Sequence, residues 1–552
     1  MGATAPLPEY VDVLVAGAGP VGALAALDLA RRGVSTLLAE QSPEPRKLPK
    51  MERCNPRTME MLRRLGLSET FRAASRFTPI DMDVFVAVDF NRPPLLHLHY
   101  PSAVEANRQF AASTDGSTPA EAAQLISQYS VEPILRQSAA DAGADVRLGW
   151  RIESFQQDDT GVDVHLVSAT GEEQTVRTAW LVGCDGGVST IRKQLGIQLE
   201  GEGRIRRLRQ VFFRSPGLFD RIPFGKGRHY YLPTGTLVVQ DDLEHFVVNF
   251  TRWEEGQEAT ATLREMLPFA ADLEIEVLHE GDWSHHLLVA ERYRDGRVLI
   301  AGDAAHLVIP QGALGMNTGA GDALDLSWKL AAVVNGYGGP YLVDSYEAER
   351  REVGLRNRDA SRRASTGVTD WRRAVRPEAY EDGPEGDRAR AEVAALAAEG
   401  QPLGHEMLGV ELGYRYTDSP IVFAEDERPM SDDLRTYVPD ATPGARLPNV
   451  WVSDGVAVQD LLGPDYTLLC TEDDCAGLDA VAAAFGEVGA PLQIVHVHDD
   501  RARKVYQAAL LLLRPDLHVV WRGDELPADL DQLAAVATGH RDARSLQLAA
   551  KA

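Results

Sequence analysis

The sequence predicts an α/β protein in which a parallel βαβ domain is interrupted by antiparallel strands and followed by a smaller α/β domain. Three observations predict this fold class. A strand, a glycine turn and a helix occupy residues 11–32. Apolar and polar residues alternate in residues 80–100 and in parts of residues 208–289, as in half-buried antiparallel strands. Strand-like and helix-like segments then resume beyond residue 443.

Composition limits both the class of protein and its partners. With 552 residues, 44% hydrophobic and 25% charged, the chain resembles an ordinary soluble globular protein of about three structural units. The net charge of −26 argues against nucleic acid or an anionic membrane as a partner. No basic, apolar leader precedes the first strand and no apolar run approaches about twenty residues, which predicts a cytoplasmic protein without a membrane anchor.

The four cysteines, Cys54, Cys184, Cys470 and Cys475, are few and irregularly spaced. This spacing predicts neither a disulfide framework nor a zinc site, and it fits a reducing compartment. We therefore expect no metal.

The opening unit is suited to bind a dinucleotide. Gly17 permits a tight turn after strand 11–16, Gly19 lets the backbone approach a pyrophosphate, and Gly22 allows close packing of helix 23–32. Pro20 and Val21 complete the turn. Glu40 ends the next strand, at residues 34–39, where a carboxylate can bind a ribose. A glycine turn that serves packing alone is the structural alternative.

The chain then alternates between the two kinds of sheet. A loop feeds a helix within residues 47–67, and residues 80–100 form antiparallel strands around a Pro-Pro break. Further elements are predicted along the middle of the chain. They are a helix at 130–142, strands at 146–148, 162–167 and 180–182, and antiparallel segments at 230–240 and 245–251.

Two later motifs also place acids beside glycines. Asp185 and Gly186 end a strand and enter a glycine turn, where the carboxylate can meet a ligand or cap a helix. Strand 298–301 delivers Asp303, after Gly302, to a turn suited to a polyol hydroxyl.

A glycine-broken loop follows at residues 310–319 and runs into helix 318–334. Backbone N–H groups near Gly315, Met316 and Asn317 could face negative charge on a bound ring, and a capped helix without a ligand is the alternative. A charged helix at 343–364 and a Pro-, Gly- and acid-rich linker at 376–387 come next. Strands at 466–470, 492–497 and 517–521 with a helix at 478–485 form the last unit.

Together these motifs resemble the single-component, FAD-dependent aromatic hydroxylases of the p-hydroxybenzoate and phenol hydroxylase group. The resemblance covers the first 350 residues. It implies a Rossmann-like FAD-binding domain with an interleaved antiparallel substrate sheet. The implied cofactor-binding residues are Gly17, Gly19, Pro20, Val21, Gly22, Glu40, Gln128, Asp185, Gly186, Gly302, Asp303, Pro310, Gly315, Met316 and Asn317. Gln128 and Glu132 match the family's glutamine ahead of a helix.

The C-terminal segments 443–452, 454–469 and 511–523 resemble the thioredoxin-like tail of phenol hydroxylases and polyketide-tailoring hydroxylases. Cys470 and Cys475 do not form CxxC, so disulfide exchange is not expected and the tail is structural or lies at an oligomer interface. The expected domains are FAD-binding (1–79, 101–205 and 291–365), substrate-binding sheet (80–100 and 206–290), helical linker (366–442) and thioredoxin-like (443–552).

The sequence departs from the family pattern at two positions. Lys50 stands where the family commonly has an arginine, so a pyrophosphate contact there lacks the arginine's fork and a solvated lysine is expected. Ala313 replaces a frequent second glycine and is expected only to stiffen the loop.

The resemblance also implies a reaction. NADPH or NADH reduces FAD and binds transiently, since no second dinucleotide fingerprint is present. Reduced flavin and molecular oxygen give a C4a-hydroperoxide, which hydroxylates a small phenolic or polyketide-derived aromatic substrate. No protein nucleophile or metal is required.

Candidates for a base that draws the phenol proton lie on the antiparallel segments: Tyr230, Tyr231, Asp241, His285 and His286. The structural alternative, a tyrosine, aspartate or histidine that only belongs to a strand, is the favoured interpretation for each of them. The family places Arg53, Cys54 and Asn55 near flavin and substrate. We expect His306 to pack or hydrogen-bond beside the flavin, Trp328 to pack within its helix, and Lys329 to be a solvated charge.

Three alternatives remain open at this point. Baeyer–Villiger oxygen insertion uses the same scaffold, and a flavin-binding protein with little turnover would use the tail to bind partners. A flavin-dependent halogenase is disfavoured because the chain has no GWxWxIP-type segment. A homodimer is the default expectation for an oligomer.

Overall fold

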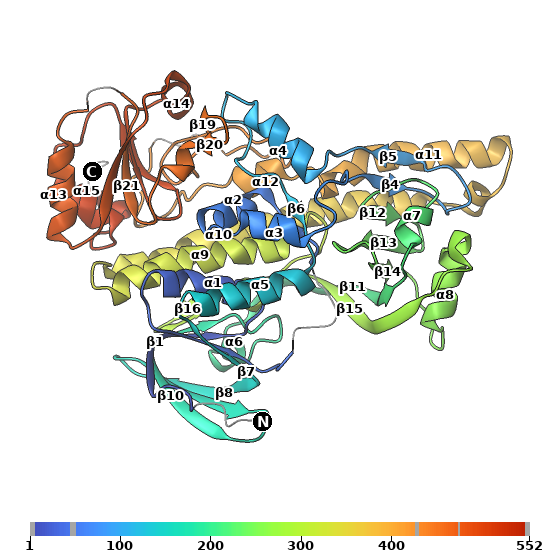
Figure 1. The fold of residues 1–552 in the computed structure, drawn as a ribbon, viewed down its shortest axis with the longest axis horizontal. Helices are drawn as coiled ribbons and strands as arrows, with labels where there is room; N and C mark the ends of the chain where they lie inside the picture. Colours follow the sequence, from blue (N-terminus) through green and yellow to red (C-terminus); the bar gives the residue numbers. More distant parts are fainter. Residues whose placement is uncertain (1–5, 45–50, 426–429, 473–474, 547–552) are drawn as a thin grey trace.

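The computed structural model describes residues 6–44, 51–425, 430–472 and 475–546. It has a mixed α/β architecture, as the sequence predicts. Figure 1 shows one sheet at the bottom, a second at the right and the C-terminal domain at the upper left, with long helices between them. Among the described residues, no helix is long and apolar enough to cross a membrane. Lys50 lies outside the described residues.

The first sheet forms around the opening strand. Residues Val13, Leu14 and Val15 are completely buried, as expected for a parallel strand covered on both faces. The strand order is β16 (Arg294–Asp295), β17 (Val298–Ile300), β10 (Glu173–Gly183), β1 (Tyr10–Ala16), β2 (Thr36–Glu40) and β7 (Asp145–Leu148), with β9 (Val162–Ser168) and β8 (Trp150–Gln157) attached to β10. The carboxyl ends of the parallel strands β1, β10 and β17 therefore meet at one edge, where all three motifs begin.

Helices cover this sheet. Alanine and leucine dominate α1 (Pro20–Arg31), which favours a helix, and Pro20 occupies its first turn. It packs against α5 (Gln128–Asp141) and α9 (Leu314–Val334). Smaller helices are α2 (Pro56–Arg64), α3 (Ser68–Ala74), α4 (Ala103–Ala111) and α6 (Thr190–Gln194), and β3 (Arg53–Cys54) pairs with β6 (Gln124–Leu125).

The second sheet is antiparallel except where β12 pairs in parallel with β4. Its order is β18 (His306–Leu307), β15 (Glu276–Ala290), β11 (Leu199–Arg214), β14 (His245–Phe250), β13 (Gly235–Val239), β12 (His229–Tyr231), β4 (Val84–Val86) and β5 (Leu96–Leu98). Residues 80–100 join it, as predicted. One face packs against α7 (Leu218–Arg221) and α8 (Ala259–Met266) through Leu218, Leu263 and Phe246.

Helix α10 (Pro340–Ala374) is longer than the predicted helix at 343–364. Its last turns pack against the second sheet, where Val368 and Trp371 contact Val84 and Tyr231. The predicted linker 376–387 leads into α11 (Pro384–Gly400), a helix that the sequence analysis did not predict, and α12 (Leu408–Leu412) follows. The segment therefore completes a wall of the second sheet.

The C-terminal domain is built on a four-stranded sheet in the order β22 (Leu492–His496), β21 (Tyr466–Cys470), β23 (Leu510–Leu513) and β24 (Val519–Gly523). Its helices are α13 (Leu478–Glu487), α14 (Asp500–Tyr506) and α15 (Leu530–Ala537), and β19 (Trp451–Ser453) pairs with β20 (Val456–Ala457). A disulfide joins Cys470 and Cys475, a pair that the sequence analysis, which predicted no disulfide framework, did not foresee. The spacing rules had pointed away from it because they describe frameworks and CxxC motifs.

Buried ion pairs fasten this domain to the long helices. Arg514 contacts Glu349 at 2.6 Å and Asp325 at 2.8 Å, and Lys329 lies 2.6 Å from Glu349 and 2.7 Å from Asp325. Lys329 is 1% exposed, so the prediction of a solvated charge is wrong. Tertiary packing hides this helix face, which local sequence cannot show. Trp328 is buried, as predicted.

Candidate active site

The three glycine motifs meet at the start of α1. Gly17 has φ +94°, and a Cβ built on it would lie 2.5 Å from the carbonyl oxygen of Cys184 in the second motif. Gly302 and Gly319 belong to the third motif, and a Cβ on either would crowd Val21, at 3.0 and 2.5 Å respectively. At Gly17 glycine is required because two backbones approach closely, whereas at Gly302 and Gly319 a Cβ would crowd the Val21 side chain.

This junction fits a diphosphate and a ribose. No side chain caps α1 at Gly19, and a Cβ on Gly19 would have no atom within 4 Å, so the positive helix end opens onto free space. Glu40 lies at the end of β2, and its two carboxylate oxygens accept from the N–H groups of Ala18 and Ser42, each at 2.9 Å. The carboxylate is thereby held beside the phosphate turn, as a ribose-binding acid must be.

Gln128 connects α5 to the same turn. Its amide donates to Glu132 at 2.7 Å, and Arg136 bridges Glu132 at 2.9 Å and the carbonyl of Ala18 at 2.7 Å. The sequence singled out Gln128 and Glu132, and Arg136 is the link it missed.

Asp185 caps α6. One carboxylate oxygen accepts from the N–H groups of Thr190 at 2.7 Å and Ile191 at 3.1 Å, while the other accepts from the Ser189 hydroxyl at 2.5 Å. Gly186 follows in the left-handed region, at φ +82°. The structure thus shows the capping role that the sequence left open beside a ligand role.

Asp303 lies half-buried in the turn Gly302–Ala304, and a second aspartate holds that turn. Asp322 accepts from the Gly302 N–H at 3.1 Å and from His306 at 2.8 Å, and its other oxygen accepts from Arg350 at 2.8 Å. Burial alone would raise the pKa of Asp322, but the charges of Arg350 and His306 hold it below its ordinary value. The hydrogen bond of His306 is to Asp322, which the sequence analysis missed, and its position beside the flavin stays a prediction.

The loop at 310–313 enters α9 through Ala313, whose backbone is left-handed at φ +54°. An alanine in this conformation is strained, so the residue does more than stiffen the loop. Asn317, one turn into the helix, accepts from the Asn55 N–H at 2.9 Å and donates to the Arg53 carbonyl at 3.0 Å. The loop that the family places near flavin and substrate is therefore tied to α9. Gly315 and Met316 lie in the same first turn.

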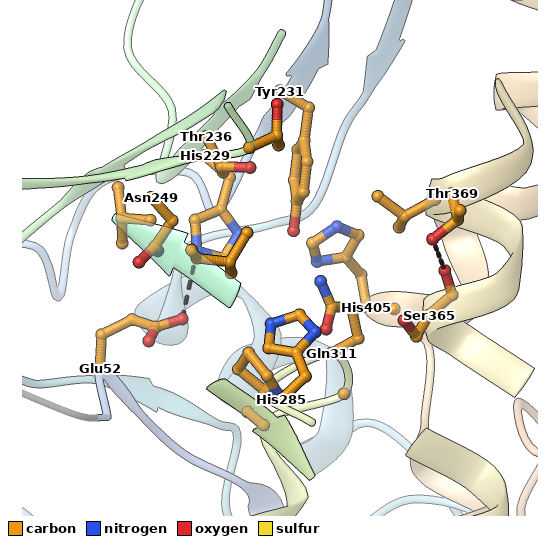
Figure 2. A pocket seen from close by; sticks show the side chains of 18 of the residues that line it. Glu52, His229, Tyr231, Thr236, Asn249, His285, Gln311, Ser365, Thr369 and His405 are labelled. Atoms are coloured by element: carbon orange, nitrogen blue, oxygen red, sulfur yellow. Dashed lines mark hydrogen bonds and ion pairs between the residues drawn. The ribbon is translucent and has the colours of Figure 1, made fainter. Parts of the chain in front are cut away.

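A cavity lies between the second sheet, the 310–313 loop and α10. It encloses about 820 Å³, part of which is open to solvent. Figure 2 shows His229, Tyr231, His285 and His405 around it, with Ser365 and Thr369 on the side opposite Glu52 and Asn249. The other lining residues are Arg53, Arg206, Leu208, Arg228, Thr236, Val238, Thr251, Trp283, Pro310, Gln311, Gly312, Ala313, Val368, Arg372 and Gly404.

The five candidate bases differ in whether they line the cavity. Tyr231 and His285 line the cavity. Their neighbours Tyr230 and His286 do not, because successive strand residues point to opposite faces. Tyr230 donates to the Gly225 carbonyl at 2.6 Å, and the partly exposed His286 accepts from the Arg204 N–H at 3.2 Å.

Asp241 accepts from Ser130 at 2.6 Å and also lies outside the lining.

Basic groups dominate the cavity wall. Burial lowers the pKa of His285 to about 4 and that of Arg372 to about 10. The pKa of His229 is also lowered by burial, although Glu52 hydrogen-bonds it at 3.1 Å. Burial raises the pKa of Tyr231 to about 12, so this phenol keeps its proton at neutral pH.

Sequence reasoning missed several wall residues. Glu52 directly precedes Arg53, and His229 directly precedes the Tyr230–Tyr231 pair. Both residues could have been found as sequence neighbours of residues that the sequence analysis had already named. Arg372 and His405 both come from the region 366–442, which was predicted as a helical linker and gave no signal for a site.

One group of three described side chains could ligate a metal: Asp83, His97 and His99 on β4, β5 and their flanks. Asp83 contacts His97 at 2.6 Å and His99 at 2.9 Å, so hydrogen bonds account for the cluster.

Comparison with known proteins identifies the fold. Residues 10–361 match the model of the FAD binding domain, and residues 440–540 match the C-terminal domain of aromatic-ring hydroxylases. The chain is 34% identical to aklavinone 12-hydroxylase DnrF of Streptomyces peucetius, over 84% of this chain and 92% of that protein. It is 30% identical to the FAD-dependent monooxygenase apdD of Emericella nidulans, over 96% and 90% of the two chains. The rebeccamycin biosynthetic enzyme RebC with reduced flavin superimposes with a TM-score of 0.87 at 32% identity, covering 97% of this chain and all of that one.

The geometry and the family match indicate the same cofactor, FAD. The geometry in question is the uncapped turn at α1 with the acids beside it. The chain belongs to the FAD-dependent aromatic-ring hydroxylases and is a flavoprotein monooxygenase that uses FAD, NAD(P)H and molecular oxygen.

Proposed function

We propose that this monooxygenase hydroxylates a phenolic or polyketide-derived aromatic ring held in the cavity beside the 310–313 loop. The observation that carries the proposal is the cavity itself. It combines the apolar side chains Leu208, Val238 and Trp283 with polar groups, and it adjoins the 310–313 loop. One relative, DnrF, is named for the 12-hydroxylation of aklavinone.

The proposed cofactor path starts at Glu40, crosses the start of α1 at Gly19, passes Asp303 and ends at the 310–317 loop. Bound FAD supplies the activation of oxygen and the transfer of one oxygen atom. The protein holds the cofactor, orients the ring and excludes water. Helix α9 begins with no side chain capping its N-terminus at Ala313, so its positive end can favour negative charge on the reduced cofactor.

We further propose that the domains follow the sequence assignment, with the C-terminal domain thioredoxin-like. A βαβ unit followed by two antiparallel strands and a helix, in strand order β22-β21-β23-β24, supports this assignment. The domain's contacts with α2, α9 and α10 support a structural role.

His229 is the proposed base. Its Nε2 lies 3.1 Å from Glu52, whose carboxylate favours the tautomer with a proton on that nitrogen. Nδ1 is buried and has no partner within the described part of the chain, so it can accept a phenol proton. We expect His229→Gln to lower kcat by about 10²-fold or more for a weakly acidic phenol. A phenol that is already ionised should be much less affected. Equal losses for both phenols, measured as pH profiles of kcat, would contradict the role.

Asp303 is proposed to bind the ribitol of FAD. Asp303→Ala should purify with less flavin and bind added FAD more weakly, because one polar contact is removed. Flavin absorbance per polypeptide measures this. Asp359→Ala, at an exposed position of α10, is the matched control. Unchanged flavin content in Asp303→Ala would rule out the contact.

A screen of phenols and hydroxylated polycyclic quinones tests the function. A substrate should accelerate flavin reduction in stopped flow, consume oxygen and gain one oxygen atom in mass. Ring cleavage or ester formation in the product would instead indicate Baeyer–Villiger insertion. Failure of every compound to stimulate NAD(P)H oxidation would favour a binding protein.

A further inference from the structure

The cavity carries more positive charge than its own acids balance. Four arginines line it, and Glu52 is the single carboxylate among the lining residues that the structure describes. Arg53 is neutralised by Glu411 at 2.7 Å. Arg206, Arg228 and Arg372 have no ion pair with any described carboxylate.

The three unpaired arginines differ in how firmly they are held. Arg372 donates to the Leu232 carbonyl at 3.1 Å and the Thr236 hydroxyl at 2.6 Å, which fixes it in the wall. Arg228 lies 2.5 Å from a ring nitrogen of His405 and is buried. Arg206 is half-buried and shows no hydrogen bond to any described residue, so its guanidinium remains available.

Unsatisfied polar atoms gather at the same wall. Five buried side-chain atoms of lining residues have no hydrogen-bond partner in the described ranges: Arg228 Nε, His229 Nδ1, His285 Nε2, Asn249 Oδ1 and Gln311 Oε1. Leaving such atoms unpaired costs about 1–3 kcal/mol each, so native proteins keep few of them. Their concentration at one cavity indicates a ligand rich in oxygen substituents.

We propose that the cavity selects an aromatic substrate that is already an anion at neutral pH, with its charged oxygen bound by the available guanidinium of Arg206. This inference rests on the proposed function and names its substrate class. An aryl carboxylate and a strongly acidic phenol share the required chemistry. Buried guanidinium groups without a counter-ion are unfavourable, and a ligand anion removes that penalty. The acceptors Asn249 and Gln311 would bind hydroxyl groups elsewhere on the ring.

Strand β11 offers a matched pair of variants. Arg206 and Leu208 face the cavity, whereas Arg207 points to the other face and pairs with Asp282. Arg206→Gln removes a cavity charge without breaking any hydrogen bond seen in the structure, and Arg207→Gln removes the same charge outside the cavity.

The test is a binding titration of the FAD-loaded enzyme, followed by perturbation of the flavin absorbance. The probes are 3-hydroxy-2-naphthoate, its methyl ester, 2-naphthol and 2,4-dinitro-1-naphthol. At least one of the two anionic probes should bind at least tenfold more tightly than the ester and 2-naphthol. Arg206→Gln should reduce this preference at least fivefold. Arg207→Gln should leave the preference unchanged, and neither variant should change the KM for NAD(P)H. Tight binding of only one anion separates a carboxylate site from a phenolate site.

Equal affinity for both anions and the neutral probes in the wild-type enzyme would overturn the inference, as would an unchanged preference in Arg206→Gln. Hydroxylation is scored separately by product mass. If the neutral probes are hydroxylated as efficiently as the anions, the anion preference is wrong while the monooxygenase function stands. Selective binding of anions without any stimulated NAD(P)H oxidation would count against the proposed function and leave the preference intact.

Discussion

At the scale of single residues, the site depends on groups whose protonation is fixed by burial. His285 is 5% exposed and lies opposite Arg206 in the strand pairing, and burial with the charges of Arg206 and Arg372 keeps it neutral. A neutral imidazole can donate or accept a hydrogen bond without adding to the cavity's positive charge.

This burial makes stability depend on pH. The pKa of His285 is about 4 in the folded protein, against an ordinary value of 6.5, so below about pH 6.5 the unfolded chain binds a proton that the folded chain does not. The free energy of unfolding should therefore fall as pH decreases from about 6.5 to 4, by at most about 3 kcal/mol from this residue. His285→Gln should flatten the decline. Urea titrations of the wild-type protein and of His285→Gln at pH 7.5 and 5.0 measure this decline. Equal declines in the two proteins would contradict the assignment of the pH dependence to His285.

At the scale of elements, α2 connects the flavin site to the C-terminal domain. The buried carboxylate of Glu60 accepts from Arg446 at 2.7 Å through one oxygen and pairs with the same guanidinium through the other. Arg57 donates to the Asp516 carbonyl at 2.9 Å, and Arg63 pairs with Asp460 at 2.7 Å. Asn55, which bonds Asn317, caps this same helix.

Removing one partner of the Glu60–Arg446 pair should be costly. Glu60→Ala leaves a buried guanidinium without its carboxylate, for which we expect a loss of about 3–5 kcal/mol in the free energy of unfolding. The double variant Glu60→Met, Arg446→Met should recover only part of this loss, because Arg57, 3.7 Å from Glu60, and the Ala120 N–H also lose their partner. Asp282→Ala, at the exposed pair with Arg207, is the control and should change little. A negligible effect of Glu60→Ala in chemical denaturation would show that the domain docks by other means.

At the scale of the whole molecule, the sequence predicted the parts that local rules govern. Gly17, Gly19, Gly22 and Glu40 could be read because strand, turn and helix are adjacent in the chain. The alternation in residues 80–100 likewise predicted strands that join the second sheet, although not their parallel pairing with β12.

What the sequence could not show depends on contacts between distant segments. The cavity wall combines Glu52, His229 and His285 with Arg372 and His405 from outside the predicted substrate sheet, and no local pattern marks such a combination. Lys329 was misjudged for the same reason, since its partner Glu349 lies on another helix. The disulfide between Cys470 and Cys475 escaped because its spacing matches no familiar motif.

The most direct test of the central claim is a single-turnover reaction of the FAD-loaded enzyme with NAD(P)H, a phenolic substrate from the screen and ¹⁸O₂. The account predicts a product whose ring carries one added hydroxyl labelled with ¹⁸O, with the other oxygen atom released as water. A product with unlabelled oxygen, or oxygen consumption that yields only hydrogen peroxide with every substrate, would contradict it.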